Sequence, residues 1–175
     1  ESPATDATPA SIPIPPKPAP TAPAAGAETS STHSLNGTST PSAPSALSGL
    51  PDLASTILSA GYLTSTSTDS FVATTTIPAG TRAAVKFSIK NIGSNATGPN
   101  WHFSASIPTQ NAYVFYSPAQ QNLNPGDSIE YILGFDQAMP GSGRSISIVA
   151  DSDQRVTESI EGNNSATATV NIRGS

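Results

Sequence analysis

The chain of 175 residues contains no cysteine, which excludes disulfide bonds, thiolate zinc sites and thiol nucleophiles. It is also poor in charged residues, at 11%, and in aromatic residues, at 6%. The seven Lys and Arg residues are scattered singly and form no basic stripe that could follow a phosphate backbone. We therefore expect no nucleic-acid partner, and a fold that an apolar core holds together alone.

Long apolar runs are missing as well. No run of 18 apolar residues that could span a bilayer is present, nor the apolar segment of a signal peptide. The sequence begins at Glu1 rather than Met, so we expect a fragment or processed form whose export signal or anchor lies upstream. Because neutral Ser, Thr and Asn replace charges, the sequence indicates an extracellular or cell-surface protein, with no membrane insertion by this part of the chain.

The distribution of proline divides the chain in two. Ten of the 17 prolines precede Pro51, in a segment rich in Pro, Ala, Ser and Thr that has few large apolar side chains. Such a segment buries too little apolar surface to offset the entropy of ordering, so residues 1–50 are predicted to be a disordered linker or stalk. Residues 51–175 are predicted to form the folded domain.

Beyond Pro51, short apolar runs with a period of two alternate with Pro, Gly and Asn, a rhythm typical of a β-sandwich. The clearest strand runs from Ala83 to Asn91, and Trp101 is predicted to be the large aromatic residue of the core. Asn124-Pro-Gly-Asp127 and Met139-Pro-Gly-Ser142 predict type II turns. Residues 53–58 are predicted to form a strand or, alternatively, a short helix around Pro51. Further strands are expected at residues 69–77, 101–106, 129–135, 146–150 and 166–172.

Four separated segments carry a family resemblance. They are Pro51-Asp-Leu53, Phe87-Ser-Ile-Lys-Asn-Ile-Gly93, Leu123-Asn-Pro-Gly-Asp127 and Val156-Thr-Glu-Ser-Ile-Glu-Gly-Asn-Asn164. In this order and spacing, residues 51–172 resemble the CARDB family of cell adhesion related domains found in bacteria. The resemblance implies an all-β fold, an immunoglobulin-like antiparallel β-sandwich of about seven strands. It also implies adhesion or display, with no catalytic residues. The family usually has Asn where this chain has Ile160, which affects the geometry of that turn.

The densest acidic cluster is formed by Asp151, Asp153, Glu158 and Glu161. Hard oxygen ligands in one loop are what calcium binds, so these residues are candidate calcium ligands, with Asp153 and Glu158 first among them. The alternative interpretation is a solvated, turn-forming acidic loop, because the spacing does not match the twelve-residue calcium loop. No other cofactor is expected.

The segment Ala112-Tyr-Val-Phe-Tyr-Ser117 is apolar on both of its faces. If it forms an edge strand, one face belongs to the core and the other can meet a partner, which makes Tyr113, Phe115 and Tyr116 candidate binding residues. The alternative is a strand that is covered on both faces. His102 beside Trp101 lacks the surroundings of a catalytic base and is interpreted as a surface histidine.

The sequence therefore predicts a non-catalytic extracellular cell-surface module for adhesion that binds a protein or a glycan. One alternative is a structural spacer or a self-assembling surface subunit, with self-association through an edge strand. A second alternative is a carbohydrate-binding accessory module of a larger secreted enzyme.

Overall fold

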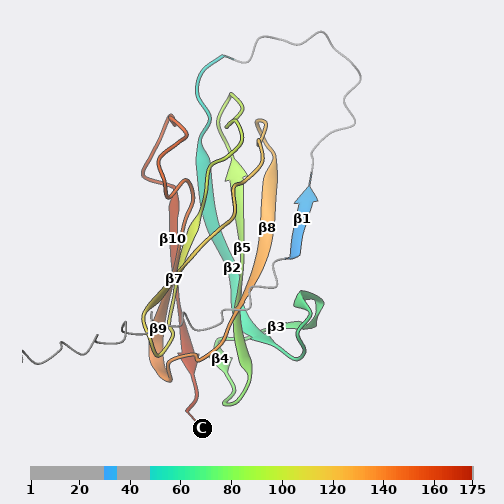
Figure 1. Ribbon diagram of the computed structural model, residues 1–175, viewed down its shortest axis with the longest axis vertical. Helices are drawn as coiled ribbons and strands as arrows, with labels where there is room; N and C mark the ends of the chain where they lie inside the picture. The colour runs from blue at the N-terminus through green and yellow to red at the C-terminus, as the bar shows by residue number, and fades with distance from the viewer. Residues whose placement is uncertain (1–29, 35–47, 175) are drawn as a thin grey trace, which may run out of the picture.

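The computed structural model of the protein describes residues 30–34 and 48–174. Most of the predicted stalk, residues 1–29 and 35–47, lies outside the described residues. Two five-stranded sheets pack face to face as an immunoglobulin-like sandwich (Figure 1). Among the described residues the only helical element is a single 3₁₀ turn, η1 (Thr68–Ser70), so the predicted all-β class is confirmed.

Sheet A has the strand order β1-β8-β5-β2-β3, and sheet B has the order β4-β10-β9-β6-β7. The ten strands exceed the expected seven because several are short edge pieces. All pairs are antiparallel except β4 with β10, which run parallel. The strands are β1 (Ser30–Ser34), β2 (Leu53–Leu63), β3 (Phe71–Ala73), β4 (Thr76–Ile77), β5 (Arg82–Asn91), β6 (Ser104–Ile107), β7 (Tyr113–Tyr116), β8 (Ser128–Phe135), β9 (Gly141–Val149) and β10 (Ser165–Ile172).

Strand β1 lies within the segment expected to be a coil. It pairs antiparallel with β8, from Ser30 opposite Ile132 to Ser34 opposite Ser128. In Figure 1 it borders β8 at the edge of sheet A. This polar strand gives β8 a neighbour on its open side, and an edge strand is the part of a sheet that most needs one.

The expected strand over residues 69–77 is divided between the two sheets. Its first part is β3, which pairs with β2 in sheet A, and its second part is β4, which pairs with β10 in sheet B. Between them the Thr74 hydroxyl accepts a hydrogen bond from Thr76 N at 3.1 Å and donates to Thr76 O at 3.1 Å. This local turn lets one segment of uniform β propensity change sheets, which the sequence pattern does not reveal.

Two other local expectations have different outcomes. The turn at 124–127 forms as predicted, since Asp127 N donates to Asn124 O at 3.0 Å and Gly126 has φ 86°. The expected turn at 139–142 is wrong: Gly141, with φ 139°, already begins β9, and the connection from β8 precedes it, over residues 136–140. The helix considered around Pro51 does not form, because residues 53–63 are the strand β2.

The core fills the space between the sheets, with Trp101 fully buried as predicted. At its centre Phe103 contacts Phe87 at 5.3 Å, Tyr131 at 4.9 Å and Phe115 at 6.0 Å between ring centroids. Such edge and tilted contacts add about 0.5–1.5 kcal/mol per pair beyond the buried area. The aromatic residues of both sheets therefore fix how the layers pack.

Three of the four segments that carry the family resemblance meet at one buried side chain, Asn91. Its Oδ1 accepts from Asp52 N at 3.1 Å and from Gly93 N at 3.0 Å, and its Nδ2 donates to Leu123 O at 2.9 Å and Asn95 O at 2.7 Å. The acidic segment joins through Asp52, whose carboxylate accepts from the Ser159 hydroxyl at 2.8 Å. The four segments therefore lie together and are joined by hydrogen bonds at one end of the sandwich.

Candidate binding site

Strand β7 ends sheet B, so the candidate binding residues do lie on an edge strand. Its pairing with β6 places Phe115 opposite Ala105 on the inner face, where Phe115 is buried against Phe103. Tyr113 points the same way and is half-buried against the core. Of the three candidates, only Tyr116 is presented to solvent, at 68% exposure, with Val114 beside it at 42%.

The acidic cluster lies in the loop between β9 and β10, where its carboxylates bind the chain itself. The buried Asp151 carboxylate accepts from Arg155 N at 3.0 Å and Val156 N at 2.9 Å, which holds the turn in place while Asp151 adopts a φ of 43°. Burial raises the pKa of Asp151, and the nearby Asp153 adds to this, although the two backbone donors oppose it.

Asp153 binds the half-buried His102 instead. Its Oδ2 lies 2.9 Å from His102 Nδ1 and 2.6 Å from Arg155 Nε, and its Oδ1 accepts from His102 N at 3.1 Å. Burial alone would raise the pKa of Asp153, but these hydrogen bonds outweigh it and the pKa is lowered. The interpretation of His102 as a structural surface residue fits this geometry.

Glu158 ties the acidic loop to the start of β2. Its Oε2 accepts from Leu53 N and its Oε1 accepts from Asn164 Nδ2 at 3.0 Å. Glu161 joins it, because Asn164 Nδ2 also donates to Glu161 Oε2 at 3.2 Å. Burial is the main cause that raises the pKa of Glu158 from 4.5 to about 7, with the charges of Glu161 and Asp151 contributing, against the opposing effect of the hydrogen bonds.

The oxygen ligands expected for calcium are therefore spread over two small groups, Asp151 with Asp153 and Glu158 with Glu161. Across residues 48–174 no three Asp, Glu or His side chains gather closely enough to hold a metal ion. Two orphan atoms lie nearby: the buried Asn163 Oδ1 and Asn164 Oδ1 have no hydrogen-bond partner, and Asn164 lines a pocket of about 260 Å³ with Asp151 and Glu161. The calcium site remains a prediction.

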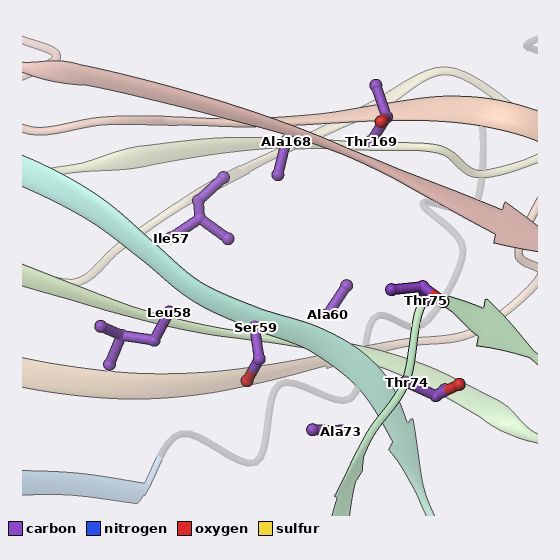
Figure 2. A pocket seen from close by; sticks show the side chains of 9 residues that line it. All are labelled: Ile57, Leu58, Ser59, Ala60, Ala73, Thr74, Thr75, Ala168 and Thr169. Atoms are coloured by element: carbon purple, nitrogen blue, oxygen red, sulfur yellow. The ribbon is translucent and has the colours of Figure 1, made fainter.

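A groove of about 460 Å³ opens at the other edge of sheet B, where β10 lies beside β2 of sheet A (Figure 2). In Figure 2 the side chain of Ala168 points from β10 toward Ile57 on β2, and Thr74 and Thr75 lie at the crossing from β3 to β4. A β-bulge lies in the wall of the groove, since the pairing of β2 with β5 skips Leu58, which is 44% exposed and lines the groove. The bulge shifts the phase of the alternation in β2, because the core-facing side chains are Leu53 and Ile57 before it and Ala60 and Tyr62 after it. The Ser and Ala residues of this segment hide that change of phase in the sequence.

Both the sequence and the fold of this chain are similar to those of CARDB domains. The CARDB family model matches residues 63–168. The crystal structure of a CARDB domain from Pyrococcus furiosus in complex with di-metal ions matches with a TM-score of 0.51 and 18% identity, covering 72% of this chain and 96% of that one. A solution NMR structure of the same archaeal domain matches with a TM-score of 0.52 and 18% identity, over 71% and 96% of the two chains. At this identity the structures show the fold alone. No curated protein matches.

Proposed function

This chain belongs to the CARDB family of cell-adhesion-related bacterial domains, and we propose that it is an extracellular module that binds a cell-surface protein or glycan. The family is non-enzymatic, and the only His–Asp pair among residues 48–174 is engaged in holding a loop. No helix in the described part of the chain is long and apolar enough to cross a membrane.

The observation that carries the proposal is the pair Tyr116 and Val114 on the edge strand β7. Exposed apolar side chains that lie next to one another form a patch that can meet a partner, and Tyr is favoured at interfaces because its apolar ring carries a polar hydroxyl. Nothing in the packing of β7 requires Tyr116, since Phe115 supplies the buried side of the strand. A binding role accounts for both residues.

The test is the binding of the full chain to intact bacterial cells. The absence of cysteine allows a single dye to be attached at Ser175→Cys, and bound fluorescence is measured against protein concentration. We expect saturable binding that Tyr116→Ala weakens about tenfold, as at an interface hot spot. The control Ile160→Ala removes a side chain of similar exposure, 57%, from the acidic loop and should leave binding unchanged. Absence of saturable binding would favour the spacer.

Thermal melting of the same chain tests whether calcium binds. The related archaeal domain was determined with di-metal ions, and in this chain Asp151, Glu161 and Asn164 line one pocket. If calcium binds there, a chelator lowers the melting temperature and calcium restores it, because a ligand that binds only the folded state stabilises it. An unchanged melting temperature in chelator and in millimolar calcium would leave the acidic loop a purely hydrogen-bonded turn.

A further inference from the structure

The outer faces of the two sheets differ sharply in charge. On sheet A the outward positions of β5 carry Arg82, Lys86 and Lys90, and Lys86 pairs with Glu130 of β8 at 3.0 Å. The outward positions of the sheet B strands carry no charged residue, and Arg173 comes only after β10 has ended. They are Thr76 of β4, Ser104 and Ser106 of β6, Val114 and Tyr116 of β7, Ser145, Ser147 and Val149 of β9, and Ser165, Thr167, Thr169 and Asn171 of β10.

We call these residues the hydroxyl face. Its register aligns them in rows that cross four strands. One row is Tyr116–Ser104–Val149–Ser165, and the next is Val114–Ser106–Ser147–Thr167. Neighbouring strands lie about 4.8 Å apart and alternate residues of a strand about 6.7 Å apart, so each row spans about 14 Å across the sheet.

The chemistry of the hydroxyl face points to a neutral hydrogen-bonding partner. Each Ser or Thr hydroxyl both donates and accepts, as the hydroxyls of a sugar do. These side chains are short, so holding them still costs little entropy. Without a Lys or Arg among its strand positions, on a chain of net charge −5, the face offers nothing to compensate an anionic ligand.

The row that begins at Tyr116 adds an aromatic platform. Its ring is exposed at the edge of the sheet and lies in register with Ser104. An aromatic ring covers an apolar face of a ligand while its hydroxyl still finds a hydrogen bond. A sugar ring has such an apolar face and hydroxyls at its rim, so it suits a tyrosine next to a grid of hydroxyls.

A second copy of the chain is a poorer fit for this face. Homodimer interfaces bury 1,200 Å² or more and are about 65% apolar at their core. The hydroxyl face presents only Val114, Tyr116 and the half-buried Val149 as large apolar side chains. That is too little apolar surface for a stable face-to-face dimer.

We propose that the outer face of sheet B binds a neutral polysaccharide, which lies across the strands with a sugar ring on Tyr116 and its hydroxyls on the Ser and Thr rows. This inference rests on the proposed binding function and names the ligand class and the surface. It places recognition on the outer face of sheet B, which borders the groove of Figure 2 at Thr169 and the pocket of the acidic loop at Val149 and Ser165.

The experiment is native affinity electrophoresis of the full chain. Gels contain hydroxyethylcellulose or glucomannan as neutral probes, or polygalacturonate as the anionic comparison. We expect at least one neutral probe to retard the protein in a concentration-dependent way and polygalacturonate not to do so. Absence of retardation by both neutral probes, or retardation by polygalacturonate alone, would overturn the proposal.

Two matched variants locate the site. Thr167→Lys puts a charge in the middle of the hydroxyl face, and Thr56→Lys makes the same change at an exposed position of β2 on the outside of sheet A. We expect Thr167→Lys and Tyr116→Ala each to weaken retardation about tenfold, and Thr56→Lys to leave it within about twofold. Near-UV circular dichroism and the melting temperature confirm that each variant is folded.

The remaining outcomes separate the inference from the proposed function. If the chain binds cells saturably but Thr167→Lys binds them as tightly as wild type, the hydroxyl face is not the site, while the binding function stands. If sedimentation equilibrium shows an oligomer that Thr167→Lys dissociates, the face is a contact between copies and the polysaccharide proposal is wrong. If neither cells nor neutral probes are bound, both proposals fail.

Discussion

Replacing Asn91 by alanine should destabilise the protein by about 3 kcal/mol. Asn91 is fully buried, and its side chain makes four hydrogen bonds. Leu123 O keeps a second donor, Thr97 N at 3.0 Å, but Asp52 N, Gly93 N and Asn95 O lose the only partners that the structure gives them. A buried group left without a partner costs about 1–3 kcal/mol. Water reaching the less buried Asn95 O lowers the sum.

Urea unfolding measures this loss directly. Trp101 is the single tryptophan of the chain and is fully buried, so its fluorescence reports the loss of the core. With an m-value of about 2 kcal/mol/M for a domain of this size, the midpoint should fall by about 1.5 M. The exposed Asn111 provides the control, and Asn111→Ala should move the midpoint by less than about 0.3 M.

Asn91→Asp tests which half of the amide matters. The aspartate keeps an acceptor for Asp52 N and Gly93 N but turns an oxygen toward Leu123 O and Asn95 O, which are acceptors themselves. The repulsion raises the pKa of the new carboxyl in the folded state. Its stability contribution is therefore retained below the unfolded pKa and lost as pH rises. A loss under about 1 kcal/mol for Asn91→Ala, or an Asn91→Asp variant that is as stable as wild type at pH 7, would refute the reasoning.

Other predictions follow from single contacts. Gly93→Ala would place a Cβ 2.5 Å from Asp52 N and should cost more than about 2 kcal/mol in urea unfolding, whereas Gly162→Ala, with open space around it, should cost less than about 0.5 kcal/mol. Since burial raises the folded pKa of Glu158 to about 7, its contribution to stability is full below about pH 4.5 and is lost as pH rises through 7. The free energy of unfolding from thermal melting should be about 2 kcal/mol lower at pH 8 than at pH 5, and Glu158→Gln should reduce this difference. Lys86→Ala breaks an exposed ion pair with Glu130 and should change the free energy of unfolding by less than about 1 kcal/mol.

The fold class could be predicted from local patterns of residues alone. Strict alternation in 83–91 and 166–172 separates a buried from an exposed face whatever the neighbours are, because a strand turns successive side chains to opposite sides. The segments that carry the family resemblance could also be recognised in the sequence. Gly93 permits a close approach of the backbone, and the Asn91 side chain bonds several backbone groups, so each has a local chemical reason for its position.

Which surfaces are free depends on how the strands pair in the folded protein. Tyr113, Phe115 and Tyr116 look alike in the sequence, and the pairing of β7 with β6 alone turns two of them inward and one outward. The carboxylates of the acidic loop look like metal ligands until the fold supplies their backbone donors, which are Leu53 N of the distant strand β2 for Glu158 and Val156 N of the closed turn for Asp151. The hydroxyl face likewise exists only once four strands from different parts of the chain lie in register. Pairing, register and burial are long-range properties, so no local pattern of residues records them.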